Sequence, residues 1–464
     1  MTTELSAAPV GDDAVVVGAS IAGLAAAASL SPRFRRVTVI ERDTLPPLGE
    51  GRHGVPQGSH AHLLLPGGLR ALDRLLPGVA TDVQKAGGHI IPASEFRFYL
   101  GAGRLAVDND TLAITGATRP LLEGVIRRRV AALENVTLAD GEVDGLVTDP
   151  TGATVNGVSV AGSASTGPET VSAELVVDAS GRRSRTPAWL DTLGYPQPEQ
   201  ERMQVGVHYS TRLFHREPDD LDGCRHVAVA PPPEVRRGGL ALAVERDRWL
   251  VTLVGTVGER PPTDLDAFVD YAARLWQPDL GHLVKDASPI GDPTTGGFPA
   301  HLRRRYDRLR RIPERLVTTG DALCSLSPLY GQGMAVSILE AELLGDLLDR
   351  HGLDRIGRRF LRRSRRIVDT AWTLATSADL TDPAIEGPRT VGWRILNRYL
   401  DRAMRVATSD SVVADSLLAV NALVAPPPTM LRPRVVARVL RLRENRNQRS
   451  SPAPDRSGGA VVPS

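Results

Sequence analysis

The chain has 464 residues, of which 42% are hydrophobic and 24% are charged. These values are ordinary for globular proteins, and they exclude a mainly disordered, collagen-like or heptad-built chain. The formal net charge of +2 creates no strong field toward nucleic acid. Cys224 and Cys324 lie far apart without CxxC spacing, so we expect neither a disulfide framework nor a zinc finger. Residues 1–13 lack the basic start of a signal peptide, and we expect a cytoplasmic protein.

A first nucleotide signature lies near the N-terminus. A β-branched run at 14–17 predicts a buried strand, and residues 18–23, Gly-Ala-Ser-Ile-Ala-Gly, predict a tight turn into a helix. A second strand at 37–40 ends at Glu41, and 41 − 18 = 23 is near the spacing of the dinucleotide fingerprint. The backbone N–H groups of the turn would hold a pyrophosphate, and Glu41 would accept bonds from a ribose. Ser20 stands where the fingerprint has its second glycine.

A second turn of the same kind lies in the last third of the chain. Residues 315–319 predict a buried strand that ends in Gly320-Asp321. The sequence Pro-Leu-Tyr-Gly-Gln-Gly-Met at 328–334 then leads into an amphipathic helix at 335–348. A glycine-relieved turn at a helix N-terminus makes another site suited to anions.

The order and spacing of these motifs resemble the FAD-dependent monooxygenases of the para-hydroxybenzoate hydroxylase fold, over roughly residues 14–350. Three further segments carry the resemblance. Residues 52–57, with His60-Ala61-His62 after them, look like squalene-epoxidase-like flavoproteins, including bacterial polyketide (polyether) epoxidases. Residues 118–123 are similar to a helix start whose arginine reaches the cofactor. Residues 175–184 match an Asp-x-x-Gly-x-x-Ser block, although Ala179-Ser180 departs from its commoner form.

The resemblance implies FAD as cofactor, with NAD(P)H or a partner flavin reductase as electron source. It implies that Arg52 and Arg119 contact the cofactor, that Asp321 holds the ribityl chain, and that residues 328–333 border the flavin. The residues expected to bind FAD are therefore Gly18, Ser20, Ile21, Ala22, Gly23, Glu41, Arg42, Arg52, Arg119, Asp321, Pro328, Gly331, Gln332, Gly333 and Met334. For Arg42, a solvated charge at a strand end is the alternative interpretation.

The implied fold class is α/β (α+β overall): a Rossmann-like FAD-binding domain with a parallel sheet, an antiparallel-sheet substrate domain and a C-terminal helical region. The strand-like alternation of residues 201–300 agrees with a sheet that roofs the flavin. The expected division is 1–200 and 305–350 for the two parts of the FAD-binding domain, 201–304 for the substrate domain with roughly 90–115 contributing, 351–445 for the helical region and 446–464 for a disordered tail.

The helical region offers two interpretations. Trp393, Leu396, Leu400 and Met404 recur at helical spacing, with arginines between them, which predicts a cap packed on the catalytic body. The alternative is a weak peripheral membrane contact through residues 431–442, an apolar helix studded with arginines. Nucleic-acid binding is not expected.

Isolated candidates carry less weight. His60 and His62 have HxH spacing but no companion ligand, so we expect no metal site and place them near the cofactor. Cys324 is expected to be a buried structural thiol. His208 and Tyr209 fall on opposite faces of one strand, so at most one faces the cavity, and His208 is a weak candidate for a catalytic base. Otherwise no catalytic residue is assigned.

The expected function is insertion of one oxygen atom from O2, through a flavin C4a-hydroperoxide, into a lipophilic natural product. Alkene epoxidation in polyketide- or terpenoid-type secondary metabolism is favoured because no convincing base is found. The alternatives are an aromatic hydroxylase of the same fold, an alkene reductase like geranylgeranyl reductase, and a non-catalytic protein that binds flavin or a hydrophobic ligand. A flavin-dependent halogenase is disfavoured because its Trp-x-Trp-x-Ile signature is missing from the sequence.

Overall fold

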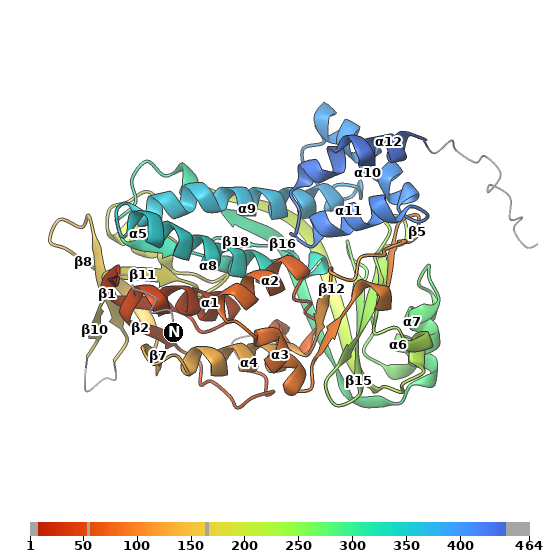
Figure 1. Ribbon diagram of the computed structural model, residues 1–464, viewed down its shortest axis with the longest axis horizontal. Helices are drawn as coiled ribbons and strands as arrows, with labels where there is room; N and C mark the ends of the chain where they lie inside the picture. The colour runs from red at the N-terminus through yellow and green to blue at the C-terminus, as the bar shows by residue number, and fades with distance from the viewer. Residues whose placement is uncertain (1–7, 53–55, 163–166, 442–464) are drawn as a thin grey trace, which may run out of the picture.

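The computed structural model describes residues 8–52, 56–162 and 167–441. Residues 53–55 of the predicted cofactor motif and the predicted tail at 446–464 lie outside these ranges, as does the end of the predicted helical region from residue 442. Figure 1 shows an elongated molecule with a parallel sheet toward one end, a large mixed sheet toward the other, and a group of C-terminal helices above the mixed sheet.

The parallel sheet holds both predicted turns. Its strand order is β17-β11-β1-β2-β7, and every neighbouring pair is parallel. Ala14 to Val17 are buried, as expected for a strand covered on both faces. Four strands come from the first half of the chain and β17 from much later, so this part of the fold is discontinuous in sequence. The strands are β1 (Gly11–Val17), β2 (Phe34–Glu41), β7 (Val136–Asp140), β11 (Leu175–Asp178) and β17 (Leu316–Thr318).

Helices that follow the two turns pack against each other. Figure 1 shows α1, α8 and α9 side by side in one layer, and α1 contacts α8 while α8 contacts α9. Gly345 permits the close approach of α1 and α8, because a Cβ there would lie 2.6 Å from Oγ of Ser29. The helices of this part are α1 (Ile21–Leu30), α2 (Pro66–Leu75), α3 (Val79–Lys85), α4 (Arg119–Ala131), α5 (Thr186–Thr192), α8 (Gln332–His351) and α9 (Ile356–Asp379).

The mixed sheet has the strand order β18-β16-β12-β15-β14-β13-β4-β5. Neighbours are antiparallel except for β13 and β4, which are parallel. Its strands are β4 (Phe96–Leu100), β5 (Gly103–Arg104), β12 (Gln200–His215), β13 (His226–Val229), β14 (Arg237–Val244), β15 (Arg248–Gly255), β16 (Pro289–Arg304) and β18 (Cys324–Ser325). Smaller sheets are formed by β8 (Val143–Thr148), β9 (Val155–Val160) and β10 (Glu169–Ser172), and by β3 (His89–Ile91) and β6 (Ile114–Gly116).

Two helices on the mixed sheet were not expected from the sequence. Helices α6 (Leu265–Ala273) and α7 (Asp279–Asp286) cover one face, where Phe268 packs with Trp249 and Phe214 of the sheet. Both helices are short and lie between strand-like segments, so the alternation of their neighbours concealed them. The other face of the sheet is therefore the one left to line a cavity.

The C-terminal helices bury a different face from the one predicted from the sequence. They are α10 (Val391–Val406), α11 (Ser411–Asn421), the 3-10 turn η8 (Pro427–Leu431) and α12 (Pro433–Arg441). In α10 the buried residues are Ala403 and Val406, not the predicted stripe. Leu396, Leu400 and Met404 instead line a large cavity. Among the described residues, no helix has the length and apolar content needed to cross a membrane.

Candidate cofactor and substrate site

The first turn packs so tightly that two of its positions require glycine. Gly18 has φ +101°, and a Cβ there would lie 2.8 Å from the carbonyl oxygen of Ala179. A Cβ on Gly23 would lie 1.8 Å from the carbonyl oxygen of Gly18. The start of α1 is therefore seated directly on the end of β1, and Gly18, Ser20, Ile21 and Ala22 line the cavity in front of it.

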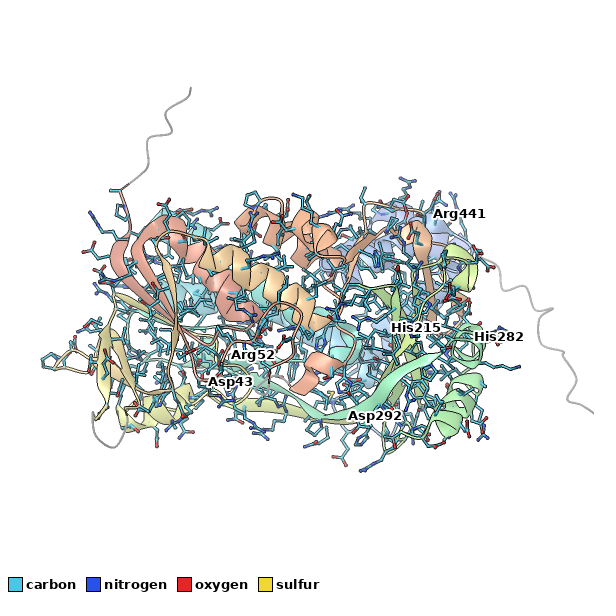
Figure 2. All side chains as sticks on the ribbon, turned by 90° about the horizontal axis from the view of Figure 1, so that it is seen from below. Asp43, Arg52, His215, His282, Asp292 and Arg441 are labelled. Atoms are coloured by element: carbon cyan, nitrogen blue, oxygen red, sulfur yellow. The ribbon has the colours of Figure 1, made fainter. Side chains whose placement is uncertain are left out.

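A buried ion network surrounds the N-terminus of α1. Glu41 accepts a hydrogen bond from the Ala19 N–H at 2.7 Å and pairs with Arg52 at 2.8 Å. Arg52 pairs in turn with Glu123 at 3.1 Å, and Glu123 pairs with Arg119 at 3.0 Å. The network brings together three predicted cofactor residues from three separate segments. Figure 2 shows Arg52 close to Asp43, in the half of the molecule that holds the parallel sheet.

Glu123 was quoted in the sequence motif but not predicted as a site residue. It accepts from Arg119 on the preceding turn of α4 and from Ser20, whose hydroxyl also accepts a bond from Arg119 at 2.8 Å. The i,i+4 spacing of Arg119 and Glu123 was the available signal. Because Glu123 ties Ser20 to Arg119, the serine that replaces the second glycine is held in a fixed polar arrangement.

Arg52 has the features of a group that is ready to bind a further acceptor. Burial alone would lower its pKa, but the carboxylates of Glu41 and Glu123 raise it, so the guanidinium stays charged. Its Nε is buried and has no partner among the described residues. Arg42, by contrast, borders the cavity with its side chain 53% exposed and lies 3.5 Å from Asp43.

The second turn presents Asp321 to the same cavity. Asp321 follows β17 in a short 3-10 turn, and Ser325 Oγ donates to its carboxylate at 3.1 Å. Burial raises the pKa of Asp321. Behind the turn, buried Glu340 of α8 accepts from the Gly320 N–H and the Thr319 hydroxyl, each at 2.7 Å. Sequence reasoning missed Glu340 because it lies inside an ordinary amphipathic helix pattern.

The start of α8 leaves open space at the position beside the predicted flavin ring. Gly331 has φ +64°, and a Cβ on Gly333 would meet only Asp321 Oδ1, at 3.9 Å. Gln332 does not line the cavity: its Nε2 donates to the carbonyl of Asn421 at 3.4 Å, so its side chain turns toward α11. The predicted contact of Gln332 with the cofactor would therefore be made by its backbone.

Arg182 also lines the cavity, and no role was predicted for it from the sequence. It donates to the Ser325 hydroxyl at 3.0 Å, and Ser325 donates to Asp321, so the Asp-x-x-Gly-x-x-Ser block meets the second turn here. Its guanidinium also lies 4.9 Å from the ring centre of Phe298. Asp178 of that block faces inward, where its carboxylate accepts from the hydroxyls of Ser180, Ser184 and Thr186.

One cavity of about 1440 Å³ joins the two turns and continues beneath the mixed sheet to the C-terminal helices. Most small-ligand pockets measure about 300–1,000 Å³, so this one has room for more than a single small molecule. Its volume, the two helix N-termini, the open space at Gly333 and the unpartnered Arg52 Nε all fit a dinucleotide such as FAD. Of the predicted cofactor residues, those lining it are Gly18, Ser20, Ile21, Ala22, Glu41, Arg42, Arg52, Arg119, Asp321, Pro328, Gly331, Gly333 and Met334.

The structure places His208 away from this cavity. His208 borders a separate hollow of about 560 Å³ on the other face of β12, whereas Tyr209 lines the large cavity. The alternation along β12 was predicted, but its pairing with β15 and β16 decides which of the two faces inward. The candidate base His208 is thus wrongly placed to reach a substrate in the large cavity.

His60 and His62 line the cavity, as expected from their position in the motif. Nδ1 of His60 lies 2.8 Å from the Thr211 hydroxyl, and Nδ1 of His62 lies 2.8 Å from the His60 carbonyl oxygen. Burial and the nearby Arg119 lower the pKa of His62 to about 3. Both rings are therefore engaged with protein groups through one nitrogen. Cys324 is buried, and burial raises the pKa of its thiol.

Comparison with known proteins places this geometry in a family. No protein-family model matches the chain. Protein Rv3254 of Mycobacterium tuberculosis is 33% identical over 469 residues, which cover 96% of this chain and 98% of the relative. Squalene epoxidase erg1 of Schizosaccharomyces pombe is 28% identical, covering 72% and 68% of the two chains. Kynurenine 3-monooxygenase of Salinispora tropica is also 28% identical, covering 87% and 84%.

Solved structures share the fold. The p-nitrophenol 4-monooxygenase PnpA of Pseudomonas putida superposes with a TM-score of 0.63 at 18% identity, covering 90% of this chain and 99% of that one. The flavin-dependent brominase Bmp2 superposes with a TM-score of 0.60 at 16% identity, covering 89% and 93%. The predicted fold class is confirmed. The chain belongs to the family of Protein Rv3254, and it is an enzyme of the FAD-dependent monooxygenase class with the para-hydroxybenzoate hydroxylase fold.

Proposed function

We propose that this enzyme transfers one oxygen atom from O2 to an alkene of a lipophilic, polyketide- or terpenoid-like metabolite, giving an epoxide. The observation that carries the proposal is the composition of the cavity beyond the two cofactor turns. There the lining comes from β4, β14 and the C-terminal helices, and the side chains are mostly aromatic and aliphatic: Phe96, Phe98, Leu240, Leu400, Met404, Leu417 and Met430. Such a lining favours an apolar substrate because it removes apolar surface from water. The polar side chains that residues 370–421 add to it are uncharged: Thr370, Thr373, Ser377, Thr381, Asn397 and Asn421.

The predicted cofactor residues divide the binding of FAD between the two turns. The first N–H groups of α1 would meet the pyrophosphate, with Arg52 and Arg119 supplying positive charge beside it. Glu41 would take the ribose and Asp321 the ribityl chain. When bound and reduced, FAD supplies the activation of O2. The electrons come from NAD(P)H or from a partner flavin reductase.

The rest of the task falls to the cavity walls, which must exclude water and hold the alkene over the cofactor. Tyr209 stands on β12 in the roof, where burial raises the pKa of its phenol, so it stays neutral and does not act as a base. Phe298 on the neighbouring strand closes the wall beside Arg182. Tyr209 and Phe298 therefore shape the space for the substrate.

The histidines of the cavity also favour a reaction that needs no base. His226 lines the cavity, and burial lowers its pKa to about 4. The pKa of His60 is likewise lowered by burial, and that of His62 falls to about 3. A general base works best when its pKa lies near the working pH, and these groups hold a proton too weakly at neutral pH. Alkene epoxidation requires no ionised substrate, whereas phenol hydroxylation gains from one.

An aromatic hydroxylase is the second candidate, and the similarity to kynurenine 3-monooxygenase and to p-nitrophenol 4-monooxygenase favours it. The two candidate functions are distinguished by the products that the enzyme forms. The purified enzyme with FAD, given NADPH or a flavin reductase, is incubated under ¹⁸O2 with lipophilic alkenes and with phenols. Epoxides that carry one ¹⁸O from O2 support the proposal. Labelled phenol products alone would assign the hydroxylase, and alkene saturation without O2 would assign a reductase instead.

A further inference from the structure

Exposed apolar side chains gather on the C-terminal helices. In the described ranges, seven large hydrophobic residues are exposed, and five of them lie between residues 391 and 440. Their exposed fractions run from 41% to 71%. A single exposed apolar residue needs no explanation, but a group of them on one surface marks an interaction site. These five residues form what we call the C-terminal patch: Val391, Ile395, Leu396, Leu431 and Leu440.

The elements that carry the C-terminal patch are packed against one another. Tyr399 of α10 donates to the carbonyl of Met430 in η8 at 2.5 Å, and Arg402 of α10 donates to the carbonyl of Val439 in α12 at 2.6 Å. In Figure 1, α10 and α12 lie together at one corner of the molecule, and Figure 2 places Arg441 at the same end. The patch is therefore one surface region rather than five scattered side chains.

The same region is strongly basic. Residues 391–441 contain eight arginines, three aspartates and no lysine or glutamate. Arg405 pairs with Asp401, and Arg438 pairs with Asp410. Five further arginines are exposed and have no salt bridge among the described residues: Arg394, Arg398, Arg432, Arg434 and Arg441. An apolar patch rimmed by such arginines has the composition of an interfacial, lipid-binding surface.

The large cavity reaches the surface at this patch. Leu396 and Leu431 line the cavity and are also 41% and 58% exposed, so they stand at its edge. Leu400, Met404 and Met430 continue the apolar lining inward from them. The route from the patch into the cavity is thus mainly apolar on α10 and η8, where Asn397 is the polar residue among the lining side chains of α10.

We propose that the C-terminal patch docks on an anionic lipid bilayer and that the cavity opens toward the membrane between α10 and η8. The entry of a lipophilic substrate by this route rests on the proposed function, whereas the docking does not. A second copy of the chain is a poor occupant, because a two-fold contact through the patch would bring its unpaired arginines together. The arginines and the aliphatic side chains together match anionic headgroups above an acyl layer.

The docking is tested with the full-length protein and two kinds of vesicle: phosphatidylcholine alone, and phosphatidylcholine with phosphatidylglycerol. We expect co-sedimentation with the anionic vesicles, weakened by salt. The double variant Ile395→Ser/Leu440→Ser should lower the partition coefficient about tenfold or more. Leu48→Ser is the matched control, because Leu48 is an exposed apolar residue that lies beside Gly124 of α4, far from the C-terminal helices. It should bind as the wild type does.

The orientation of the opening is tested with Leu431→Trp, measured against Leu48→Trp. Brominated lipid should quench the emission added by Leu431→Trp and leave that added by Leu48→Trp unchanged. Equal quenching of both would overturn the placement of the opening. No binding to either vesicle, or concentration-dependent self-association abolished by Ile395→Ser, would overturn the docking. Vesicle binding by an enzyme that oxygenates none of the tested substrates would support the docking and count against the proposed function alone.

Discussion

Tyr330 donates a hydrogen bond of 2.6 Å to Asp379, and Nε2 of His301 lies 2.6 Å from the other oxygen of the same carboxylate. The Ser327 N–H donates to His301 Nδ1, so Nε2 carries the proton and donates to Asp379. His301 belongs to β16 of the mixed sheet, Tyr330 to the turn before α8, and Asp379 to the end of α9. One buried carboxylate therefore joins three segments that meet at the cavity.

Asp379→Asn should destabilise the fold while preserving the size of the side chain. The amide offers one acceptor atom where two donors now meet a carboxylate, so one donor is left without a proper acceptor. Unfolding by denaturant should show a loss of about 2 kcal/mol or more. Asp401→Asn on exposed α10 is the control and should stay within about 0.5 kcal/mol of the wild type. Equal stability of the two variants would show that the Tyr330–Asp379–His301 arrangement contributes little.

Asp321→Ala should give a folded protein that binds FAD about tenfold more weakly or worse, because a charged acceptor for the ribityl chain is lost. The FAD-to-protein ratio and the quenching of flavin fluorescence measure this. Asp354→Ala changes an exposed carboxylate that pairs with Arg359 after α8, and it should retain normal FAD content. Gly18→Val should also lose FAD, with added strain from φ +101° and the Ala179 carbonyl. Normal FAD affinity in Asp321→Ala would contradict the assigned cofactor position.

The stability of the enzyme should depend on Glu340 in a defined pH window. Burial raises its pKa from 4.5 to about 7, so the folded state binds the proton more tightly than the unfolded state does. This contribution is fully present below about pH 4.5 and is lost as the pH rises toward about 7, by about 3 kcal/mol in all. Glu340→Gln removes the titration. The difference in unfolding free energy between the wild type and the variant should therefore move by that amount across the window and stay constant above it. A constant difference from about pH 4.5 to 7 would refute the assignment.

His208→Ala should leave turnover within about threefold of the wild type, because the side chain borders the smaller hollow. Tyr209→Ala, the neighbouring change on the inward face, should lower kcat/KM about tenfold by disturbing the roof of the cavity. The measurement uses whichever substrate the ¹⁸O2 experiment identifies. A steep loss of activity in His208→Ala that follows a single ionisation would restore His208 as the base.

The sequence by itself determined the two cofactor turns. Gly18, Gly23 and Glu41 belong to one short β-α-β unit, in which backbone sterics and helix geometry act between residues close in sequence. The Gly320-Asp321 turn and the start of α8 follow the same local logic. Alternation also separated His208 from Tyr209, because successive side chains of a strand point to opposite faces.

Only the tertiary structure decided the rest. Strand pairing chose Tyr209 over His208 for the inner face, and helical periodicity could not reveal that Leu400 and Met404 border a cavity rather than a packed core. The partners of Glu340 and Asp379 lie on other elements, so no local pattern marks these two residues. A period in the sequence tells which residues share a face, but the identity of what lies against that face is a property of the assembled fold.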